Sequence, residues 1–266
     1  MSDPIYVAQT FDPEHCDSQF SKQEWFRERA GEASEKGATF GRYSVWPEKF
    51  LYRPDGKVLR AFFVDRAPVS IIQGPVGSGT STACCHKMWA ISNEQQPNAM
   101  GQRMTRWIVV RNTFDELKQT TLKTWKYWFV QVAQKIFGDV KMSNPPEHNI
   151  YFDRPDGTTV IVEFIFLSLD NEDDVSKLTS MEATGVWFNE KAIFDMAHSR
   201  AMQGRYPPKL EGGPTWKGVI ADLNAPPDDH FVPYFRGEVD FPEDWDDAKR
   251  REYEKPDDWN FFIQPP

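Results

Sequence analysis

The chain has 266 residues, of which 39% are hydrophobic and 14% aromatic, so it is long enough to bury the core of one large α/β domain. Its net charge of −9 argues against a surface that binds DNA or membrane everywhere, although it does not exclude a local basic patch. Three cysteines provide no disulfide framework, and no segment has the composition of a membrane span or a signal peptide. We therefore expect a soluble cytoplasmic protein.

The N-terminal residues 1–45 are polar and charged, and they are expected to form an arm or a lid. Within them, Ser21–Ala30 has a plausible N-cap and the composition of a short helix. The sequence Pro54-Asp55-Gly56 predicts a turn flanked by strands over Tyr52–Leu59.

Apolar runs then alternate with helical segments, which predicts a mostly parallel, doubly wound sheet. Helices are expected over about 80–93 and 115–137. The expected strands are Val69–Ile72, Trp107–Val110, Asn149–Phe152, Thr158–Leu167, Gly185–Phe188 and Gly218–Asp222. The turn at Arg154–Gly157 joins two of these strands as a hairpin. From about Pro226 the chain is acidic and proline-rich, and residues 241–266 are expected to be a linker.

The segment Gly74-Pro75-Val76-Gly77-Ser78-Gly79-Thr80-Ser81 follows the first of these strands and has the spacing of a phosphate-binding loop. Glycines let backbone N–H groups surround a phosphate, and the helix that follows directs its positive end at the same charge. Ser81 stands where a hydroxyl would bind Mg²⁺, but Thr80 replaces the lysine that would reach the β- and γ-phosphates. The loop therefore predicts a nucleotide site whose hydrolytic activity is in question. A glycine-rich turn that binds no phosphate is the alternative.

The segment Val186-Trp187-Phe188-Asn189-Glu190 has the pattern of the second half of such a site, an apolar strand that ends in metal-organising and water-activating residues. Glu190 would be the general base. Asn189 replaces the usual aspartate and would act on the metal through a bound water. The alternative is an ordinary strand whose end reaches solvent.

Three further candidates follow from position alone. Asn224, at the end of the next strand, would sense the γ-phosphate and couple hydrolysis to movement, or would simply belong to a turn. Arg200 and Arg205 would stabilise the transferring phosphate in cis or across a subunit interface, or would be solvated surface residues. The segment Thr120–Trp128 would contact a nucleic acid backbone, or would be an amphipathic helix that buries its tryptophans.

The cysteines and histidines offer no zinc or nucleophile pattern. The adjacent Cys84 and Cys85 are expected to pack in the core, and His148 and His230 lie in turn-like sequence without metal-ligand spacing.

Taken in order, these segments resemble the ATPase half of bacteriophage terminase large subunits over about Pro68–His230. The matching pieces are Gly74–Ser81, Val109–Thr113 with Glu116–Lys118, Thr120–Trp125, Phe166–Asp170, Thr184–Glu190, Gly204–Pro208 and Leu223–His230.

This resemblance implies an ASCE-type P-loop ATPase that uses ATP and Mg²⁺, with a mostly parallel central sheet flanked by helices. It makes Gly74–Ser81 the Walker A loop, Asn189 and the catalytic Glu190 the Walker B end, and Asn224 part of the coupling motif. The family implies a ring, pentameric by resemblance, that docks on the portal of a procapsid in the host cytoplasm. There it drives double-stranded DNA inward and works with a small terminase subunit.

The expected domains are an arm at 1–45, the ATPase at 46–240, and a linker at 241–266 toward a nuclease domain that this chain does not contain. We therefore expect no DNA cleavage by this chain, and only weak DNA binding by a monomer. The Walker A departure leaves rescue by Lys87 or Lys191 open. A non-hydrolysing nucleotide-binding or assembly module and a helicase-like nucleic-acid ATPase remain the alternative functions.

Overall fold

The computed structural model describes residues 42–43, 50, 52–154, 156–169, 178, 181–189, 204–224 and 231–265. Almost all of the expected N-terminal arm, including Ser21–Ala30, lies outside these residues. Glu190, Lys191, Arg200 and His230 lie outside them as well.

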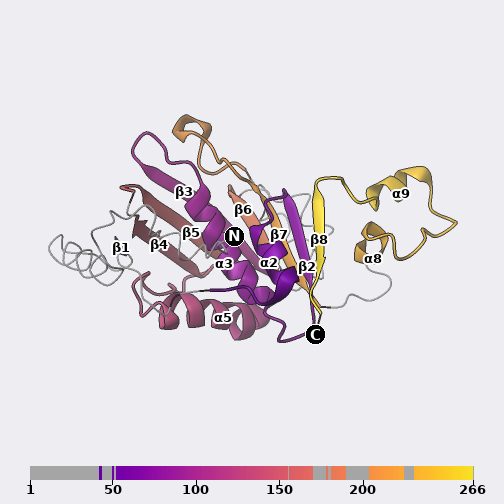
Figure 1. Ribbon diagram of the computed structural model, residues 1–266, viewed down its shortest axis with the longest axis horizontal. Coiled ribbons are helices and arrows are strands. Elements are labelled where there is room, and N and C mark those ends of the chain that lie inside the picture. Colours follow the sequence, from indigo (N-terminus) through magenta and orange to yellow (C-terminus); the bar gives the residue numbers. More distant parts are fainter. Residues whose placement is uncertain are drawn as a thin grey trace.

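A single eight-stranded sheet forms the centre of the described chain (Figure 1). Its order is β1-β4-β5-β3-β6-β7-β2-β8, and all neighbouring pairs are parallel except the hairpin of β4 and β5. The strands are β1 Arg42–Tyr43, β2 Val69–Gln73, β3 Gln102–Arg111, β4 Glu147–Asp153, β5 Thr159–Ser168, β6 Gly185–Asn189, β7 Gly218–Leu223 and β8 Trp259–Ile263. The six strands expected from Val69 to Asp222 are all present, so the mostly parallel α/β prediction is confirmed.

The position of β7 defines the type of fold. This strand lies between β2, which leads into the phosphate loop, and β6, which ends at Asn189. A strand inserted between the strand that leads into Gly74–Ser81 and the strand that ends at Asn189 is the arrangement expected of an ASCE-type P-loop fold. Since ligands of open parallel sheets bind at the carboxyl ends of the strands, the ends of β2, β7 and β6 mark the place to look for a site.

Helices pack on both faces of the sheet. They are α2 Gly56–Val64, α3 Thr80–Glu94, α4 Phe114–Glu116, η2 Leu117–Thr121, α5 Leu122–Lys126, η3 Tyr127–Val132, η4 Lys209–Glu211, α8 Phe231–Phe235 and α9 Asp247–Glu252. The four segments from α4 to η3 form one continuous helical stretch in which η2 and η3 are π-helical. The predicted helices over 80–93 and 115–137 are thus confirmed, although the second ends at Val132.

Side chains alternate between two cores, one on each face of the sheet. The larger core joins the sheet to α2, α3 and the helical stretch from Phe114 to Val132, whereas the smaller core contains residues of α8. Ile220 belongs to the larger core and Ala221 to the smaller one, as the two-residue period of a strand requires. By the same alternation, Asp222 of β7 and Asn189 of β6 face the α3 side.

The prediction of a strand-flanked turn at Tyr52–Leu59 is wrong, because residues 56–64 form α2. Pro54-Asp55-Gly56 does mark a change of direction, but it precedes a helix. Leu59, Phe62 and Phe63 are spaced by three and four residues, so one helical face buries all of them. Burial of that face against α3 stabilises the helix, since the segment is too short to be stable alone.

The prediction of a linker at 241–266 is also wrong for its last part. Trp259–Ile263 pairs in parallel with β2, and Trp259 is buried in the smaller core. Figure 1 shows β8 beside β2 at one edge of the sheet, with α8 and α9 beyond it. The prolines that suggested a linker lie before and after the strand, where they remove no hydrogen bond from it.

Burial disfavours the charged form of two histidines, His86 of α3 and His148 of β4. Burial lowers the pKa of His86 to about 3 and that of His148 to about 4. The thiols of Cys84 and Cys85 are fully buried, and burial together with the nearby charge of Asp222 raises their pKa well above the usual value. The prediction that both cysteines pack in the core is confirmed.

Within the described residues, no helix combines the length and the hydropathy needed to cross a bilayer.

Candidate nucleotide site

The loop Gly74–Ser81 joins the carboxyl end of β2 to the first turn of α3. Gly77 and Gly79 have φ of +85° and +84°, a region that favours glycine, and Gly79 is the N-cap of α3. At Gly74 a Cβ would lie 2.6 Å from Ser78 Oγ, so the backbone there has no room for a side chain. These glycines hold the loop in the tight conformation that its spacing predicts.

The loop has the chemistry to hold phosphate. The first N–H groups of a helix have no intrahelical acceptor, so Thr80 and Ser81 at the start of α3 direct unsatisfied donors outward. The hydroxyl of Ser78 is buried and has no hydrogen-bond partner among the described residues. An orphaned donor beside a helix N-terminus fits a nucleotide phosphate.

Ser81 touches the ends of two strands, and this contact is the centre of the site. Its Oγ donates to Asp222 Oδ2 at 2.5 Å, and Asn189 Nδ2 donates to Ser81 Oγ at 3.3 Å. Asn189 and Asp222 are direct partners in the register of β6 and β7. The strand order, rather than any closeness in sequence, brings the three side chains together.

Asp222 is a buried carboxylate that receives several hydrogen bonds. Only 2% of it is exposed. Besides Ser81, it accepts from Asn189 Nδ2 at 2.9 and 3.0 Å and from Trp187 Nε1 at 2.8 Å. Such bonds offset the cost of burying a carboxylate next to the phosphate loop.

The orientation of the Asn189 amide follows from its neighbours. Its Oδ1 accepts from Thr121 Oγ1 and, at 3.3 Å, from Arg111 Nη1, while its Nδ2 donates to the carboxylate of Asp222. The reversed amide would put its N–H₂ group against the Arg111 guanidinium, which can only donate, and its oxygen against the Asp222 carboxylate. The side of Asn189 that faces Ser81 is therefore its N–H₂ group.

The helical stretch from Phe114 to Val132 is anchored at this site. Thr121, at the end of η2, is buried against Asn189. Arg111, which ends β3, donates to the Asn189 carbonyl at 3.2 Å and pairs with Glu116 Oε2 at 3.6 Å. This stretch thus contacts Asn189 directly through Thr121 and indirectly through the pair of Glu116 with Arg111.

The remaining predicted residues fall at different places. Asn224 is exposed and directly follows Leu223, whose carbonyl accepts from Gly74 N at 3.0 Å, so it lies close to the phosphate loop.

Arg205 lies elsewhere, because its N–H donates to the carbonyl of Ala183, before the start of β6. Up to roughly 20 Å of extended chain separates Ala183 from Asn189. Within one molecule, Arg205 therefore lies at the amino end of β6, whereas the loop lies at the carboxyl ends of the strands.

Lys87 does not replace the missing Walker A lysine. It is fully buried on α3, with Nζ 2.7 Å from the Phe62 carbonyl and 3.7 Å from Asp65 Oδ2. Burial lowers the pKa of this ammonium to about 7, partly offset by Asp65. Its charge is thus directed at α2.

Among the described residues, no group of three or more histidine, cysteine, aspartate or glutamate side chains could hold a metal ion by itself. A P-loop site needs no such group, because the phosphates and water supply most of the magnesium ligands. The donor set of Ser81 and Asp222, one hydroxyl and one carboxylate, fits that requirement.

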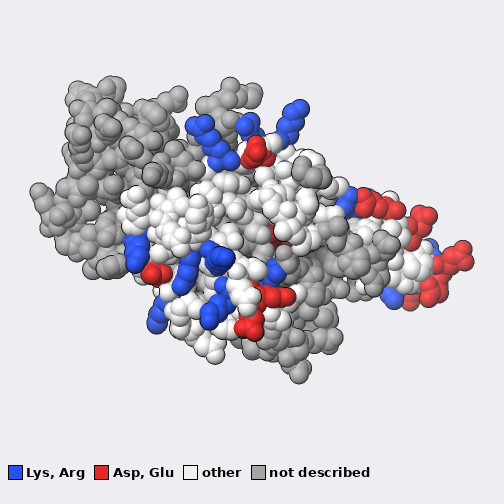
Figure 2. All heavy atoms as spheres, turned by 90° about the horizontal axis from the view of Figure 1, so that it is seen from below, with Lys and Arg blue, Asp and Glu red and all other residues white. Residues whose placement is uncertain are grey.

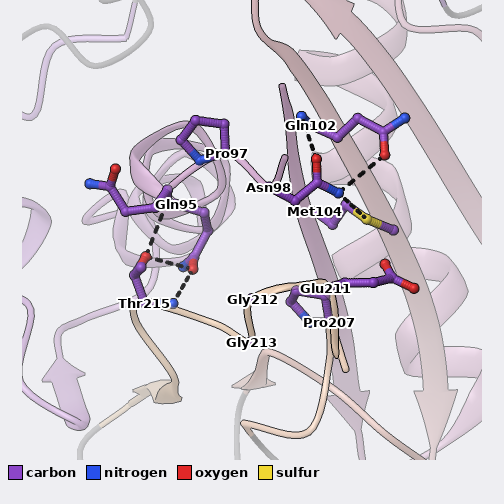
Figure 3. A pocket seen from close by; sticks show the side chains of 11 residues that line it. Gln95, Pro97, Asn98, Gln102, Met104, Pro207, Glu211, Gly212, Gly213 and Thr215 are labelled. Atoms are coloured by element: carbon purple, nitrogen blue, oxygen red, sulfur yellow. Dashed lines mark hydrogen bonds between the residues drawn. The ribbon is translucent and has the colours of Figure 1, made fainter. Parts of the chain in front are cut away.

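A second hollow, of about 170 Å³, lies near the amino end of β3, away from the carboxyl ends of the strands (Figure 3). It lies between the end of α3 and the segment 207–215, where Gln95 Oε1 accepts from Thr215 N at 2.8 Å. Gln102, at the start of β3, also lines it. Because it adjoins the amino end of this strand, it is separate from the phosphate loop.

Sequence reasoning missed Asp222 as a site residue. The signal was present as an acid that ends the apolar run Gly218–Ala221, but its importance depends on which strand lies beside β7.

No protein-family model matches this chain, and no curated protein matches its sequence. Solved structures are similar to it, including the following three. The large terminase ATPase domain of Thermus phage P74-26 is 15% identical, with a TM-score of 0.43 over 80% of this chain and 81% of that one. The large terminase of a thermophilic bacteriophage is 15% identical, with a TM-score of 0.46 over 79% of this chain and 46% of that one. The HK97 bacteriophage large terminase is 12% identical, with a TM-score of 0.45 over 77% and 45% of the two chains. The solved structures to which this chain is similar thus include bacteriophage large terminases and their ATPase domains.

Proposed function

We propose that this chain is the ATPase motor domain of a phage terminase large subunit, which powers translocation of double-stranded DNA into a procapsid. The observation that carries the proposal is the contact of Ser81, in a phosphate-binding loop, with Asp222 and Asn189 at the ends of two adjacent strands. The motif set of the sequence directs the proposal to a packaging motor rather than to another P-loop enzyme.

In this proposal the loop Gly74–Ser81 holds the ATP phosphates through backbone N–H groups. Ser81 is the metal ligand, and bound Mg²⁺ would neutralise charge on the β- and γ-phosphates. Glu190 follows Asn189 directly and orients and deprotonates the attacking water. Thr80 supplies no cation, so turnover by this chain is slow.

Binding of ATP tests the site directly. We expect Ser81→Ala to lower the affinity for a fluorescent ATP analogue about tenfold in Mg²⁺ and little in EDTA, because only the metal-bound complex uses the hydroxyl. Thr82→Ala, one residue further along α3, is the matched control and should bind as the unaltered chain does. Absence of Mg²⁺-dependent ATP binding by the unaltered chain would refute the proposed function.

The helical stretch from Phe114 to Val132 is the proposed DNA contact. Its inner side touches Asn189 through Thr121, and its outer side lines an open groove of about 810 Å³. Lys118, Lys123 and Lys126 lie along that groove. Figure 2 shows basic side chains gathered on this face, with few acidic ones beside them, whereas acidic side chains crowd the far end near α9. A local basic surface on an acidic protein suits a phosphate backbone.

Salt dependence measures this contact. Changing Lys118, Lys123 and Lys126 together to alanine should weaken double-stranded DNA binding, and it should reduce the slope of log affinity against log salt by up to about 3, since each phosphate contact contributes about 0.9. The triple variant Lys209→Ala, Lys249→Ala and Arg251→Ala has the same charge change on exposed side chains elsewhere. Equal slopes for the two triple variants would show that net charge alone determines binding.

The remaining parts of the proposal concern assembly. A ring on the portal of the procapsid would bring Arg205, remote from the loop of its own chain, to the site of a neighbour, and Arg200 is the second candidate. The small terminase subunit and the procapsid are the other proposed partners, and the host cytoplasm is the proposed location.

A further inference from the structure

We propose that Asp222 of β7 supplies the metal-organising carboxylate that the Walker B position lacks, so that this role has moved by one strand. The inference rests on the proposed nucleotide site. It replaces the expected action of Asn189 through a metal-bound water.

Asp222 is closer to Ser81 than Asn189 is. In a P-loop site the magnesium ion lies between the loop hydroxyl and the Walker B aspartate. Here the oxygen nearest to Ser81 Oγ from the strand ends belongs to Asp222, at 2.5 Å. Asn189 approaches the same hydroxyl at 3.3 Å, and it does so with nitrogen.

Asp222 and Asn189 also differ in hydrogen-bond polarity toward Ser81. A water bound to Mg²⁺ donates its hydrogens and needs an acceptor. The N–H₂ group of Asn189 is a donor, and the amide oxygen is directed to Thr121 and Arg111. Asp222 is an acceptor with a formal negative charge, which is the ligand type that Mg²⁺ prefers.

The register of the sheet places Asp222 beside the position where the carboxylate was expected. Asn189 and Asp222 are paired across β6 and β7, and both face α3. A carboxylate can therefore lie on either strand and still reach Ser81. Trp187 and Asn189 donate hydrogen bonds of 2.8 to 3.0 Å to the Asp222 oxygens. Two side chains of β6, the strand on which the carboxylate was expected, thus fix the position of Asp222.

The test compares ATP affinity in Mg²⁺ and in EDTA, together with Mn²⁺ binding followed by electron paramagnetic resonance. For the unaltered chain, affinity should rise with the metal. In Asp222→Asn this metal-dependent gain should fall about 10- to 100-fold, the range for loss of a group that organises a metal site, while affinity in EDTA should not fall. Asp247→Asn, an exposed carboxylate on α9, is the control and should retain the gain.

A double variant separates a metal role from a structural one. Asn189→Asp with Asp222→Asn keeps one carboxylate and one amide in the same pair, and it should restore Mn²⁺ binding and the metal-dependent gain. A full gain in Asp222→Asn would overturn the inference but leave the nucleotide site standing. An equal loss in Mg²⁺ and EDTA, or failure of a folded double variant to restore Mn²⁺ binding, would make Asp222 a structural residue. Absence of metal-dependent ATP binding by the unaltered chain would refute the proposed function itself.

Discussion

Thr80→Lys should raise ATP turnover by about 10- to 100-fold. An ammonium group in the phosphate loop gains charge-assisted hydrogen bonds to phosphate oxygens, each of about 1.5–3 kcal/mol, and this energy is realised as negative charge develops during phosphoryl transfer. Thr80 is the first residue of α3 and is partly exposed, so a longer side chain has room to extend. Steady-state phosphate release at saturating Mg²⁺-ATP measures the effect.

Two further variants show whether this gain comes from the site. Thr80→Lys with Glu190→Gln should return turnover to the background, because the amide cannot accept the proton of water. Thr82→Lys places the same charge two residues further along α3 and should leave turnover unchanged. If Thr80→Lys is no more active than the unaltered chain, then the missing lysine is not what limits hydrolysis.

The chain should lose about 4 kcal/mol of its free energy of unfolding between pH 7.5 and pH 5 through two buried histidines. His86 and His148 have their pKa lowered from 6.5 to about 3 and about 4 by burial. A base with a lowered pKa stabilises the fold fully above its unfolded pKa, and this stabilisation is lost as the pH falls from 6.5 toward the folded value. At pH 5 each histidine accounts for about 2 kcal/mol. Lys87, with a pKa lowered from 10.5 to about 7 by burial, follows the same rule, so its stabilisation is lost mainly as the pH falls from 10.5 to 7, above this window.

His86→Phe tests this prediction, because it removes one of the two groups. The imidazole stacks on Tyr52 with ring centroids 4.3 Å apart, and neither ring nitrogen has a hydrogen-bond partner among the described residues, so an apolar ring suits the position. Urea unfolding at both pH values should show about half of the acid loss in the variant. His148 should still contribute the other half of the acid loss in this variant. Trp125 donates to its Nδ1, which places its proton on Nε2 beside the Phe137 carbonyl. An unchanged pH dependence would mean that His86 titrates normally.

The strands that are continuous apolar runs were predictable from sequence, and two elements with conflicting signals were not. Val69–Ile72 and Gly185–Phe188 are apolar runs that end in loop residues, and only a buried strand suits them. At α2, a strong turn signal outweighed the helical spacing of Leu59, Phe62 and Phe63. At β8, flanking prolines concealed a strand whose stability depends on pairing with β2, almost 200 residues earlier in the chain.

Some residues of the candidate site were likewise predictable from the sequence, and others were not. The phosphate loop was visible because all its residues are consecutive and its spacing is a local requirement. Asp222 was not assigned, because its contact with Ser81 spans 141 positions and requires β7 to lie beside β6. Arg205 fails as a cis candidate for a related reason, since the direction of β6 decides which edge of the sheet it occupies.

The pairing of β8 with β2 also has a mechanical consequence. Gln264 N donates to the Gln73 carbonyl at 2.8 Å, and its Cβ lies 3.1 Å from where a Cβ on Gly74 would be. Tension applied to the chain at Gln264 would therefore act first on the strand that carries the phosphate loop. In a machine that moves a polymer against a load, this edge of the sheet is a place where force and nucleotide occupancy would influence each other.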